Sequence, residues 1–533
     1  MARVTRVGSK EAPEEKDEKL AGEYSKYEAS RSPFLLRAQE CSKLTIPTLV
    51  PPTGSNGATK FVTPYQGVGA RGVNNIASKL LLALLPANQP FFRLDIDNKI
   101  LDELGAARGA AEEALSEIEM RTVKEINSSQ VRVKVFEALK HLIVAGNALV
   151  YVPPKDTKLK VYPISQYVVN RDAVGNVMCI ITKETVAYET LPADIKAELD
   201  FPDERDDEEI AIYTRVEWEE DHWEVEQEID GKLIESSKTT YPADKCPWLA
   251  LRLIVVDGED YGRSYVEEYL GDLKSLEGLT KAIVEGSAAA AKLLIFVSPN
   301  GTTRKRTVAE AANLAVLEGN ASDVTAFRVD KGGDFSVALQ TAQSITERLS
   351  FAFMLNSAVQ RQADRVTAEE IRYIANELED TLGGVYSILG NEFQLPFATL
   401  ILSRMQRQKK IPDLPKGMVT PMIITGMEAL GRQADLQKLD MFVQALGALS
   451  PEVVSQYLNI EEYIKRRAAA LQVDIKDLVR TKEEVMQEQQ QAQQQQAMMQ
   501  MAQAAVPNAV KGMADAANQN MAQQQGEANG ATA

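Results

Sequence analysis

Histidine and cysteine are scarce in this chain of 533 residues. The two histidines, His141 and His222, lie far apart and show no paired spacing that would bind a metal ion. This pattern disfavours a zinc site and a histidine-based hydrolase, so both residues are expected to be structural. The cysteines, Cys41, Cys179 and Cys246, are widely spaced, and their odd number argues against a disulfide framework. We therefore expect no metal site and a reducing compartment.

Long hydrophobic runs are also absent. The longest, "LLLALL" and "AAAAKLLIFV", are far shorter than the roughly 20 residues that a membrane helix needs. The N-terminal stretch "MARVTRVGSKEAPEEKDEKL" is charged and has no apolar core of a secretory signal. These features predict a soluble, cytoplasmic protein with no membrane partner.

Motifs that bind nucleotides or carry a nucleophile are missing or incomplete. No Gly-rich loop ends in Lys-Ser or Lys-Thr, and "GRSYV" around Ser264 lacks the second glycine of a nucleophile elbow. "GVGARG", from Gly67 to Gly72, matches G-x-G-x-x-G, but Pro64 and Gln66 precede it and no clear apolar strand follows its helix. We expect these glycines to serve close packing, and we expect neither a cofactor nor an enzymatic activity.

The net charge of −17 would usually argue against a nucleic-acid binder, but the charge is concentrated in one stretch. Between Asp200 and Asp230 there are fifteen acidic residues and only two basic ones, Arg205 and Arg215. The net charge of this stretch is −13, and the rest of the chain is nearly balanced. Alternation with Val216, Trp218 and Val225 predicts the solvated face of an antiparallel sheet. The alternative is a divalent-cation site, although the ligand spacing of a calcium loop is lacking.

Hydrophobic periodicity predicts a mixed architecture in the N-terminal half. The chain is long enough for two or more domains, and its composition of 44% hydrophobic and 25% charged residues is that of a globular protein. Helices are expected around residues 73–84, 101–126 and 131–143. From Ala148 onward short β-branched runs indicate strands, with "RDAVGNV" as a hairpin connection.

The C-terminal half is expected to be mainly helical. One long helix should cover Val266 to Leu294, and Asp334 should cap another that runs to about Leu355. Thr367 and Glu370 form a capping box, which predicts a helix from about Ala368 to at least Glu392. Pro396 should kink or end this helix, and several shorter helices should follow.

Five collinear blocks resemble the portal proteins, or head-to-tail connectors, of short-tailed, podovirus-type bacteriophages. The blocks are "TPYQGVGARGVNNIASKLLLALLP", "VFEALKHLIVAGNALVY", "DGEDYGRSYVEEYLGDLKSLEGL", "LSFAFMLNSAVQ" and "RVTAEEIRYIANELEDTLGGVYSIL". The resemblance extends from about Arg31 to Arg480. It is weakest in about the first twenty residues, in the insert from Pro299 to Lys331 and in the Gln-rich tail.

The resemblance implies an α+β, predominantly helical portal fold that assembles as a ring, typically of twelve subunits. Its parts would be a wing (1–262), a first stem helix (263–298), a clip (299–333), a second stem helix (334–355), a tunnel loop (356–366), a wing spine helix (367–413), a helical crown (414–480), a Gln-rich helix (481–505) and a disordered tail (506–533).

The resemblance also implies where this chain would meet DNA and partner proteins. Gln360, Arg361, Gln362 and Arg365 would lie in the tunnel loop and face DNA phosphates, which set affinity without reading sequence. The alternative is that both arginines pair with nearby acids such as Asp364 or Glu369.

Two further basic sets are candidates. The clip residues Arg304, Lys305 and Arg306 would meet the packaging motor and then the tail adaptor, unless they belong to a merely solvated turn. Lys274, Lys281 and Lys292 would face the channel from the first stem helix, although a solvated stripe would show the same spacing.

The expected function is therefore a non-enzymatic phage portal at the capsid vertex of the virion, assembled in the host cytoplasm. It would conduct double-stranded DNA during packaging and ejection, with no metal and no cofactor. Its partners would be further copies of itself, the terminase motor, the tail adaptor, scaffolding and major capsid proteins, and internal core proteins. The alternatives are a virion scaffold without a channel and an acidic metal-dependent hydrolase that uses the Asp200 to Asp230 cluster.

Overall fold

The computed structural model describes most of the chain up to residue 423 and a little beyond it. The described residues are 19–86, 90–96, 108–155, 158–199, 209–290, 294–327, 332–355, 377–378, 382, 384–414, 419–423, 440–445 and 463–464. They divide into two compact units, the first made of Met1–Gly105 and Ala114–Leu430, the second of Ala106–Glu113 and Gly431–Ala533. In the second unit the Tyr463 hydroxyl donates to Asp440 Oδ1 at 2.7 Å.

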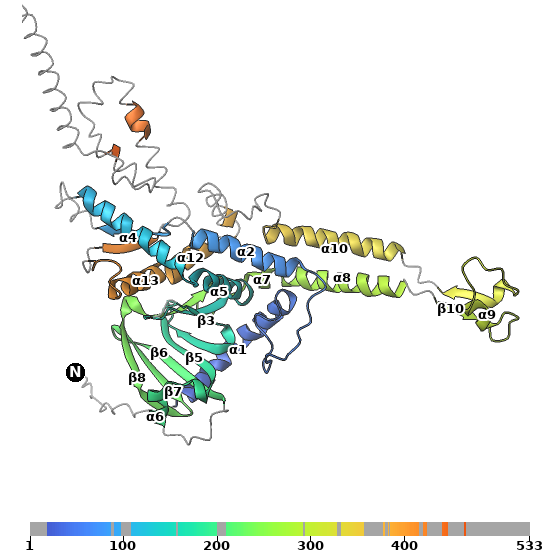
Figure 1. The fold of residues 1–533 in the computed structure, drawn as a ribbon, viewed down its shortest axis with the longest axis horizontal. Coiled ribbons are helices and arrows are strands. Elements are labelled where there is room, and N and C mark those ends of the chain that lie inside the picture. The colour runs from blue at the N-terminus through green and yellow to red at the C-terminus, as the bar shows by residue number, and fades with distance from the viewer. Residues whose placement is uncertain are drawn as a thin grey trace, which may run out of the picture. The chain divides into compact units, whose positions relative to one another are not determined.

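Four helices lie in the described N-terminal part of the chain, and the last three correspond to the helices that hydrophobic periodicity predicts. They are α1 (Leu20–Leu44), α2 (Val68–Leu84), α4 (Arg108–Ser128) and α5 (Val131–Ala145) (Figure 1). Gly146 ends α5 with φ of 74°, a left-handed conformation that favours glycine. A Cβ at Gly146 would lie 2.5 Å from the Arg263 backbone, so glycine also permits this close approach.

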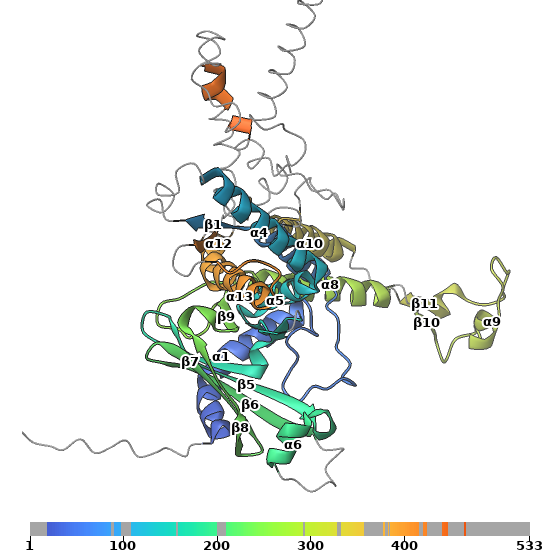
Figure 2. The same cartoon turned by 60° about the vertical axis from the view of Figure 1, so that its left-hand side comes forward.

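Two antiparallel sheets follow (Figure 2). The three-stranded sheet has the order β3-β2-β9, and the five-stranded sheet is a meander from β4 to β8. Their strands are β2 (Asn147–Tyr151), β3 (Lys160–Tyr162), β9 (Trp248–Arg252), β4 (Tyr167–Arg171), β5 (Val177–Ala187), β6 (Glu209–Glu219), β7 (His222–Ile229) and β8 (Lys232–Pro242). The β4–β5 hairpin confirms the connection predicted at "RDAVGNV". The pairing of β6 with β7 confirms that much of the acidic stretch belongs to an antiparallel sheet.

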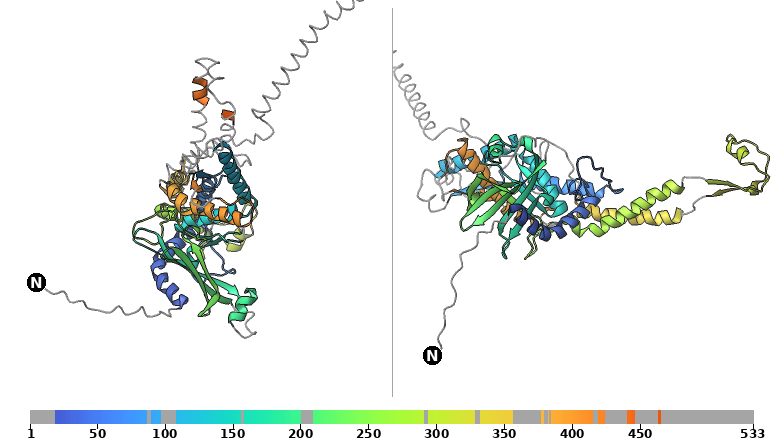
Figure 3. Two further views of the ribbon diagram at one scale, coloured as in Figure 1. Left: turned by 90° about the vertical axis from the view of Figure 1, so that its left-hand side faces the viewer. Right: turned by 90° about the horizontal axis from the view of Figure 1, so that it is seen from below.

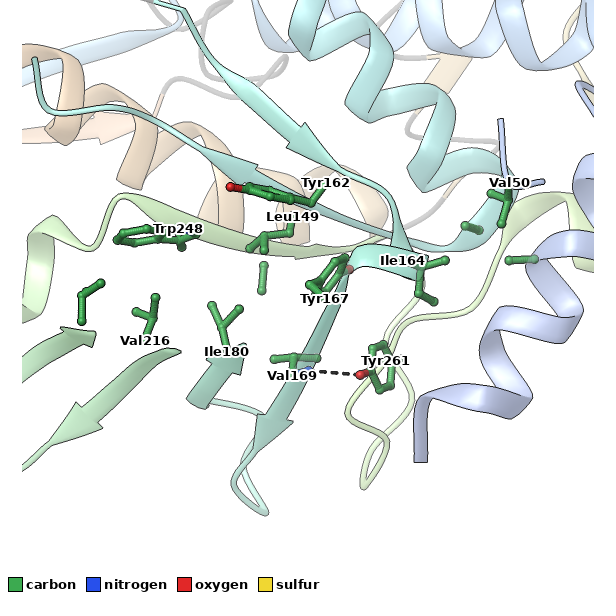
Figure 4. Packing of buried hydrophobic residues seen from close by; sticks show 14 residues of the cluster. Val50, Leu149, Tyr162, Ile164, Tyr167, Val169, Ile180, Val216, Trp248 and Tyr261 are labelled. Carbon is green, nitrogen blue, oxygen red and sulfur yellow. Dashed lines mark hydrogen bonds between the residues drawn. The ribbon is translucent and has the colours of Figure 1, made fainter. Parts of the chain in front are cut away.

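A large cluster of buried hydrophobic residues lies between these two sheets. Leu149 and Trp248 come from the three-stranded sheet, and Ile180 and Val216 come from the five-stranded sheet (Figure 4). Tyr261, only 1% exposed, closes one end of the core. Its hydroxyl accepts a hydrogen bond from the Val169 backbone N–H at 3.0 Å, which satisfies both groups inside the core.

A pair of helices follows the sheets. After the short α7 (Tyr265–Glu268), α8 (Leu270–Ala290) lies alongside α10 (Gly332–Ala352), as the right-hand view in Figure 3 shows. In the chain between them come β10 (Leu294–Val297), α9 (Lys305–Ala309) and β11 (Val324–Phe327), and the two strands pair antiparallel.

Two predicted boundaries in this helix pair are wrong. The first helix was expected to continue to Leu294, but Leu294 begins strand β10, where "LIFV" can pair with β11. Asp334 was expected to be an N-cap, yet α10 begins at Gly332 and Asp334 already lies inside its first turn. Gly332 and Gly333 form the start of the helix, although glycine has a low helix propensity.

The helical region after residue 377 also differs from the prediction. The helix was expected to end or kink at Pro396. It does not end there, because α12 (Val385–Leu389), the π-helical turn η7 (Gly390–Gln394) and α13 (Leu395–Arg407) follow one another directly. Pro396 lies in the first turn of α13, where its missing N–H costs little. The interruption is therefore the π-helical turn before the proline.

A further pair of strands, far apart in the sequence, was also not predicted. β1 (Phe92–Ile96) pairs antiparallel with β12 (Val419–Ile423), so the stretch after α2 does contain a strand, and the first described residues of the expected crown are not helical. The pairing is antiparallel and joins residues more than three hundred positions apart, such as Phe92 and Ile423. It is therefore not the parallel βαβ unit that a dinucleotide site would require.

Candidate functional site

The residues expected to face DNA lie mainly outside the described part of the chain. Gln360, Arg361, Gln362, Arg365 and Lys292 all fall in this group. The capping box of Thr367 and Glu370, the Gln-rich helix and the expected tail also fall outside it. The structure does describe Leu355, just before segment 356–376, and Glu377, just after it.

Lys274 and Lys281 on α8 are about half exposed, and both have acidic partners. The Lys274 ammonium lies 2.5 Å from Glu40 Oε1 on α1, so this ion pair links two elements. Lys281 lies 3.9 Å from Glu285 Oε1, one turn further along the same helix. Exposed pairs of this kind contribute little to stability because water screens them. Both lysines therefore carry charge at the surface, while Lys274 is also oriented towards α1.

The basic cluster after β10 stands on an ordered turn. Asp323 Oδ2 accepts hydrogen bonds from the Thr303 backbone N–H and the Thr302 hydroxyl, each at 3.1 Å. These donors, the Thr303 N–H foremost, lower the pKa of Asp323 and keep it ionised. Arg304 then forms the N-cap position of α9, and Lys305 and Arg306 begin the helix.

All three basic side chains of this cluster are exposed. Arg306 Nε donates to Glu310 Oε1 at 2.8 Å, one helical turn away. Exposed apolar residues accompany the cluster within the same 294–327 stretch, and they include Phe296 at 58%, Leu314 at 94% and Val316 at 101% exposure. A surface that combines exposed apolar groups and positive charge is typical of a protein-binding site.

The acidic face of the five-stranded sheet is organised around one arginine. Arg215 lies 2.5 Å from Glu226, and 3.3 Å from both Glu217 and Glu23. Arg215, Glu217 and Glu226 line an open cavity of about 350 Å³ together with Glu224, Lys238 and neighbouring residues. Burial, partly opposed by Arg215, raises the pKa of Glu217. Arg215 and Lys238 thus line the cavity together with its glutamates, and their positive charges disfavour the binding of a cation there.

Within the described residues, no group of three or more His, Cys, Asp or Glu side chains could hold a metal ion. His141 and His222 occupy opposite environments. His141 is buried in α5, and burial lowers its pKa to about 4. His222 is exposed, and hydrogen bonds with Asp221 and Glu224 raise its pKa. Neither histidine belongs to a metal-binding cluster in the part of the chain that the structure describes.

Side chains from other elements hold the end of α10, immediately before segment 356–376. The Tyr265 hydroxyl donates to the Ala352 carbonyl at 2.8 Å. The Asn75 amide on α2 donates to the carbonyls of Phe353 and Met354 at 2.9 and 3.0 Å. These carbonyls lie at the C-terminal end of α10, where the last carbonyls of a helix have no partner within the helix itself. Nothing in the sequence spacing indicated this role for Asn75.

A second unpredicted cluster fixes the π-helical turn to the sheets. Glu392 accepts three hydrogen bonds from Arg252 of β9: from the backbone N–H at 2.9 Å, Nε at 3.0 Å and Nη2 at 2.7 Å. Arg171 of β4 lies 3.9 Å away and donates to the carbonyls of Gly175, Ala250 and Asp260. Burial lowers the pKa of Arg171, and Glu392 opposes this shift. Arg252 and Glu392 are 140 positions apart, so no local motif could reveal their pairing.

No helix within the described ranges is long and apolar enough to span a membrane.

Comparison with known proteins places the chain in a family. The model of the family "Bacteriophage head to tail connecting protein" matches residues 17–479. The portal protein of Escherichia phage T7 is 43% identical over 481 residues, which cover 88% of this chain and 89% of that protein. The portal protein of Enterobacteria phage T3 is 43% identical over 471 residues, covering 86% of this chain and 88% of that protein.

Among solved structures, a chain of the "Virion of native gene transfer agent (GTA) particle" covers 75% of this chain and 89% of its own length. Its TM-score is 0.33 at 13% identity, too low to support an argument about this fold. The family match and the two portal relatives confirm the resemblance seen in the sequence, and with it a structural rather than an enzymatic role. The chain belongs to the bacteriophage head-to-tail connecting proteins, the family of the phage portal proteins.

Proposed function

We propose that copies of this chain form a ring whose channel carries double-stranded DNA during packaging and ejection. The observation that carries the proposal is the similarity to portal proteins, at 43% identity over 88% of the chain. The helix pair α8 and α10, with the basic β10–α9–β11 stretch between them in the chain, is consistent with a stem and clip. A ring of about twelve subunits is the expected assembly.

The described elements fit a division of labour within each subunit. The sheets and helices up to residue 262 would form the wing, and α8 and α10 the stem. The clip would begin with strand β10 at Leu294, because that strand pairs with β11, which lies within the expected clip. The crown would follow β12, since that strand belongs with β1 in the first unit.

Within the ring, Gln360, Arg361, Gln362 and Arg365 would face the DNA from a loop between the stem and the wing spine helix. Repeated in every subunit, the arginines would offer rings of guanidinium groups that contact phosphates without reading sequence. Lys281 and Lys292 would add positive charge along the stem, and Lys274 would share its charge with Glu40. The acidic sheet would keep the outer surface from binding DNA tightly.

The clip surface would bind the protein partners. Arg304, Lys305 and Arg306, in the same stretch of chain as exposed apolar groups, are suited to dock first a terminase motor and then a tail adaptor. Scaffolding protein, major capsid protein and internal core proteins would contact other parts of the ring during assembly in the host cytoplasm. ATP hydrolysis would belong to the motor.

Negative-stain electron microscopy of the purified full-length chain tests this proposal. We expect rings with a central hole, seen end-on and side-on. A compact monomer would contradict the proposal, and solid or filamentous assemblies would point to a scaffold without a channel. Divalent-cation-dependent hydrolysis of a phosphoester by a monomer would instead support a metal-dependent hydrolase.

A further inference from the structure

We infer that Lys79 of α2 is a positioning residue that holds both described flanks of segment 356–376. One flank is the C-terminal end of α10, and the other begins at Glu377. Lys79 Nζ lies 2.7 Å from Glu377 Oε2 and 3.4 Å from the Met354 carbonyl oxygen. A single ammonium group therefore connects the residues just before the segment with the residue just after it.

The face of α2 that carries Lys79 contacts the end of α10 at several positions. Gly72, Asn75 and Lys79 follow one another at spacings of three and four, so they lie on one side of the helix. A Cβ at Gly72 would lie 2.4 Å from Phe353 Cγ, so the absence of a side chain lets α10 approach. Asn75 then bonds the carbonyls of Phe353 and Met354, and Lys79 reaches past them to Glu377.

Burial makes the Lys79 contact specific. Lys79 is 7% exposed, and its side chain and that of Glu377 are 9% and 23% exposed. An ammonium group removed from water must keep its hydrogen-bond acceptors, because a buried charge without a partner is strongly destabilising. Its described acceptors, the Met354 carbonyl and the Glu377 carboxylate, both stay within reach only if the end of α10 and residue 377 keep their separation. The lysine thus imposes a fixed distance between the two flanks.

The neighbouring side chains provide a natural comparison. Within the described residues, the hydrogen bonds of the Asn75 amide and the Tyr265 hydroxyl go to the end of α10, and neither reaches residue 377. Lys79 binds both flanks. Loss of Asn75 should therefore loosen one flank, and loss of Lys79 should loosen both. If segment 356–376 carries Arg361 and Arg365 into a channel, as the proposed function holds, α2 is the support that sets its position.

Hydrogen exchange measured by mass spectrometry on the full-length protein tests this inference. In Lys79→Met we expect exchange to accelerate about tenfold both in residues 346–355 and in residues 377–389, a change of about 1.4 kcal/mol in local stability. In Asn75→Ala the acceleration should be confined to 346–355. Strands β5 and β6 should exchange as slowly as in the unchanged protein, which would show that the variants are folded.

Glu377→Gln keeps the test decisive if Lys79→Met does not fold. This substitution removes the negative charge of the partly exposed partner, Glu377, and it should accelerate exchange mainly in residues 377–389. The double variant should be no faster there than Lys79→Met alone, because the two residues act as one unit. Unchanged exchange in 377–389 on loss of Lys79, or equal acceleration of both flanks in Asn75→Ala, would overturn the inference. These readouts need no DNA, so they stand or fall separately from the proposed channel.

Discussion

Single buried polar residues join parts of this chain that are far apart in sequence. Arg31 of α1 is 2% exposed and donates through Nη1 to the Tyr24 hydroxyl and to the carbonyls of Ser165 and Tyr167. Glu28 accepts from its Nη2 at 2.6 Å. Because each buried donor needs an acceptor, the position of α1 against β4 is specified and does not merely result from apolar packing.

His141 makes a pH-dependent contribution to stability at the residue scale. Burial lowers its pKa to about 4 from an ordinary value of 6.5, with a further small lowering by Lys140 and an opposing effect of Glu137. In the described part of the chain its Nδ1 has no hydrogen-bond partner, so a proton there would be a poorly solvated charge. The folded protein therefore favours the neutral form of the His141 imidazole. Its contribution is fully present above pH 6.5 and is lost as the pH falls towards 4.

We predict that His141→Leu reduces the loss of stability between pH 7.5 and pH 5 by about 2 kcal/mol. Urea unfolding followed by circular dichroism at both pH values measures this difference. His222→Gln is the matched control, because Asp221 and Glu224 raise the pKa of His222 and its contribution has the opposite sign. Parallel pH profiles for His141→Leu and the unchanged protein would contradict the prediction.

At the element scale, periodicity predicted the elements whose contacts are local. The helix from Val68 to Leu84 and the β4–β5 hairpin follow from apolar spacing and turn residues. Strands β1 and β12 were missed because their only described ladder joins them across more than three hundred residues, and β12 contains Pro421. The end of α8 was misplaced because "LLIFV" suits a helix or a strand, and its pairing with β11 decides.

The glycines of "GVGARG" show a packing role that the sequence did indicate. A Cβ at Gly69 would lie 2.6 Å from the Leu44 carbonyl oxygen, and one at Gly72 would lie within 2.4 to 2.8 Å of Phe353. Phe353 is 0% exposed, and the nearest atoms include its own Cβ, so the ring cannot simply turn away. The prediction of close packing is therefore confirmed.

We predict that Gly72→Ala destabilises the protein by about 1–3 kcal/mol, because overpacking outweighs the gain in helix propensity. Gly278→Ala in α8 is the matched control, since nothing lies within 4 Å of its added Cβ. That change should stabilise by up to about 1 kcal/mol through propensity alone. Chemical unfolding of both variants gives the comparison, and equal effects of the two substitutions would show that Phe353 does not limit the site.

At the scale of the whole molecule, clusters of acidic and of basic residues lie on different elements. Part of the acidic stretch lies on β6 and β7, where Arg215 pairs with Glu217, Glu226 and, from α1, Glu23. Exposed basic residues occur on α8 and α9. The family could be identified from sequence because collinear blocks extend along most of the chain. The clamp of Lys79 and Glu377 could not be predicted in the same way. Each residue lies within one of these blocks, but the two are 298 positions apart and no local spacing relates them.

The arginines of segment 356–376 give the last prediction, which belongs to the assembled ring. If Arg361 and Arg365 contact phosphates, replacing both with glutamine should weaken DNA binding and reduce its salt dependence. The slope of log K against log salt should fall by about 0.9 for each phosphate that an arginine no longer neutralises. Glutamine keeps a polar side chain, so the change chiefly removes charge. Binding of double-stranded DNA to purified rings over a range of salt concentrations measures the slope, and filled particles report packaging and retention.

Arg121→Gln is the control for loss of positive charge in this experiment, because Arg121 is exposed on α4 and paired with Glu117 at 2.7 Å. It should leave both the slope and the yield of filled particles unchanged. If the double variant also packages, retains and ejects DNA like the unchanged protein, the arginines serve only their acidic neighbours such as Asp364 and Glu369. A lower slope with normal ring formation would instead place their charge at the DNA, because only a phosphate contact releases counterions.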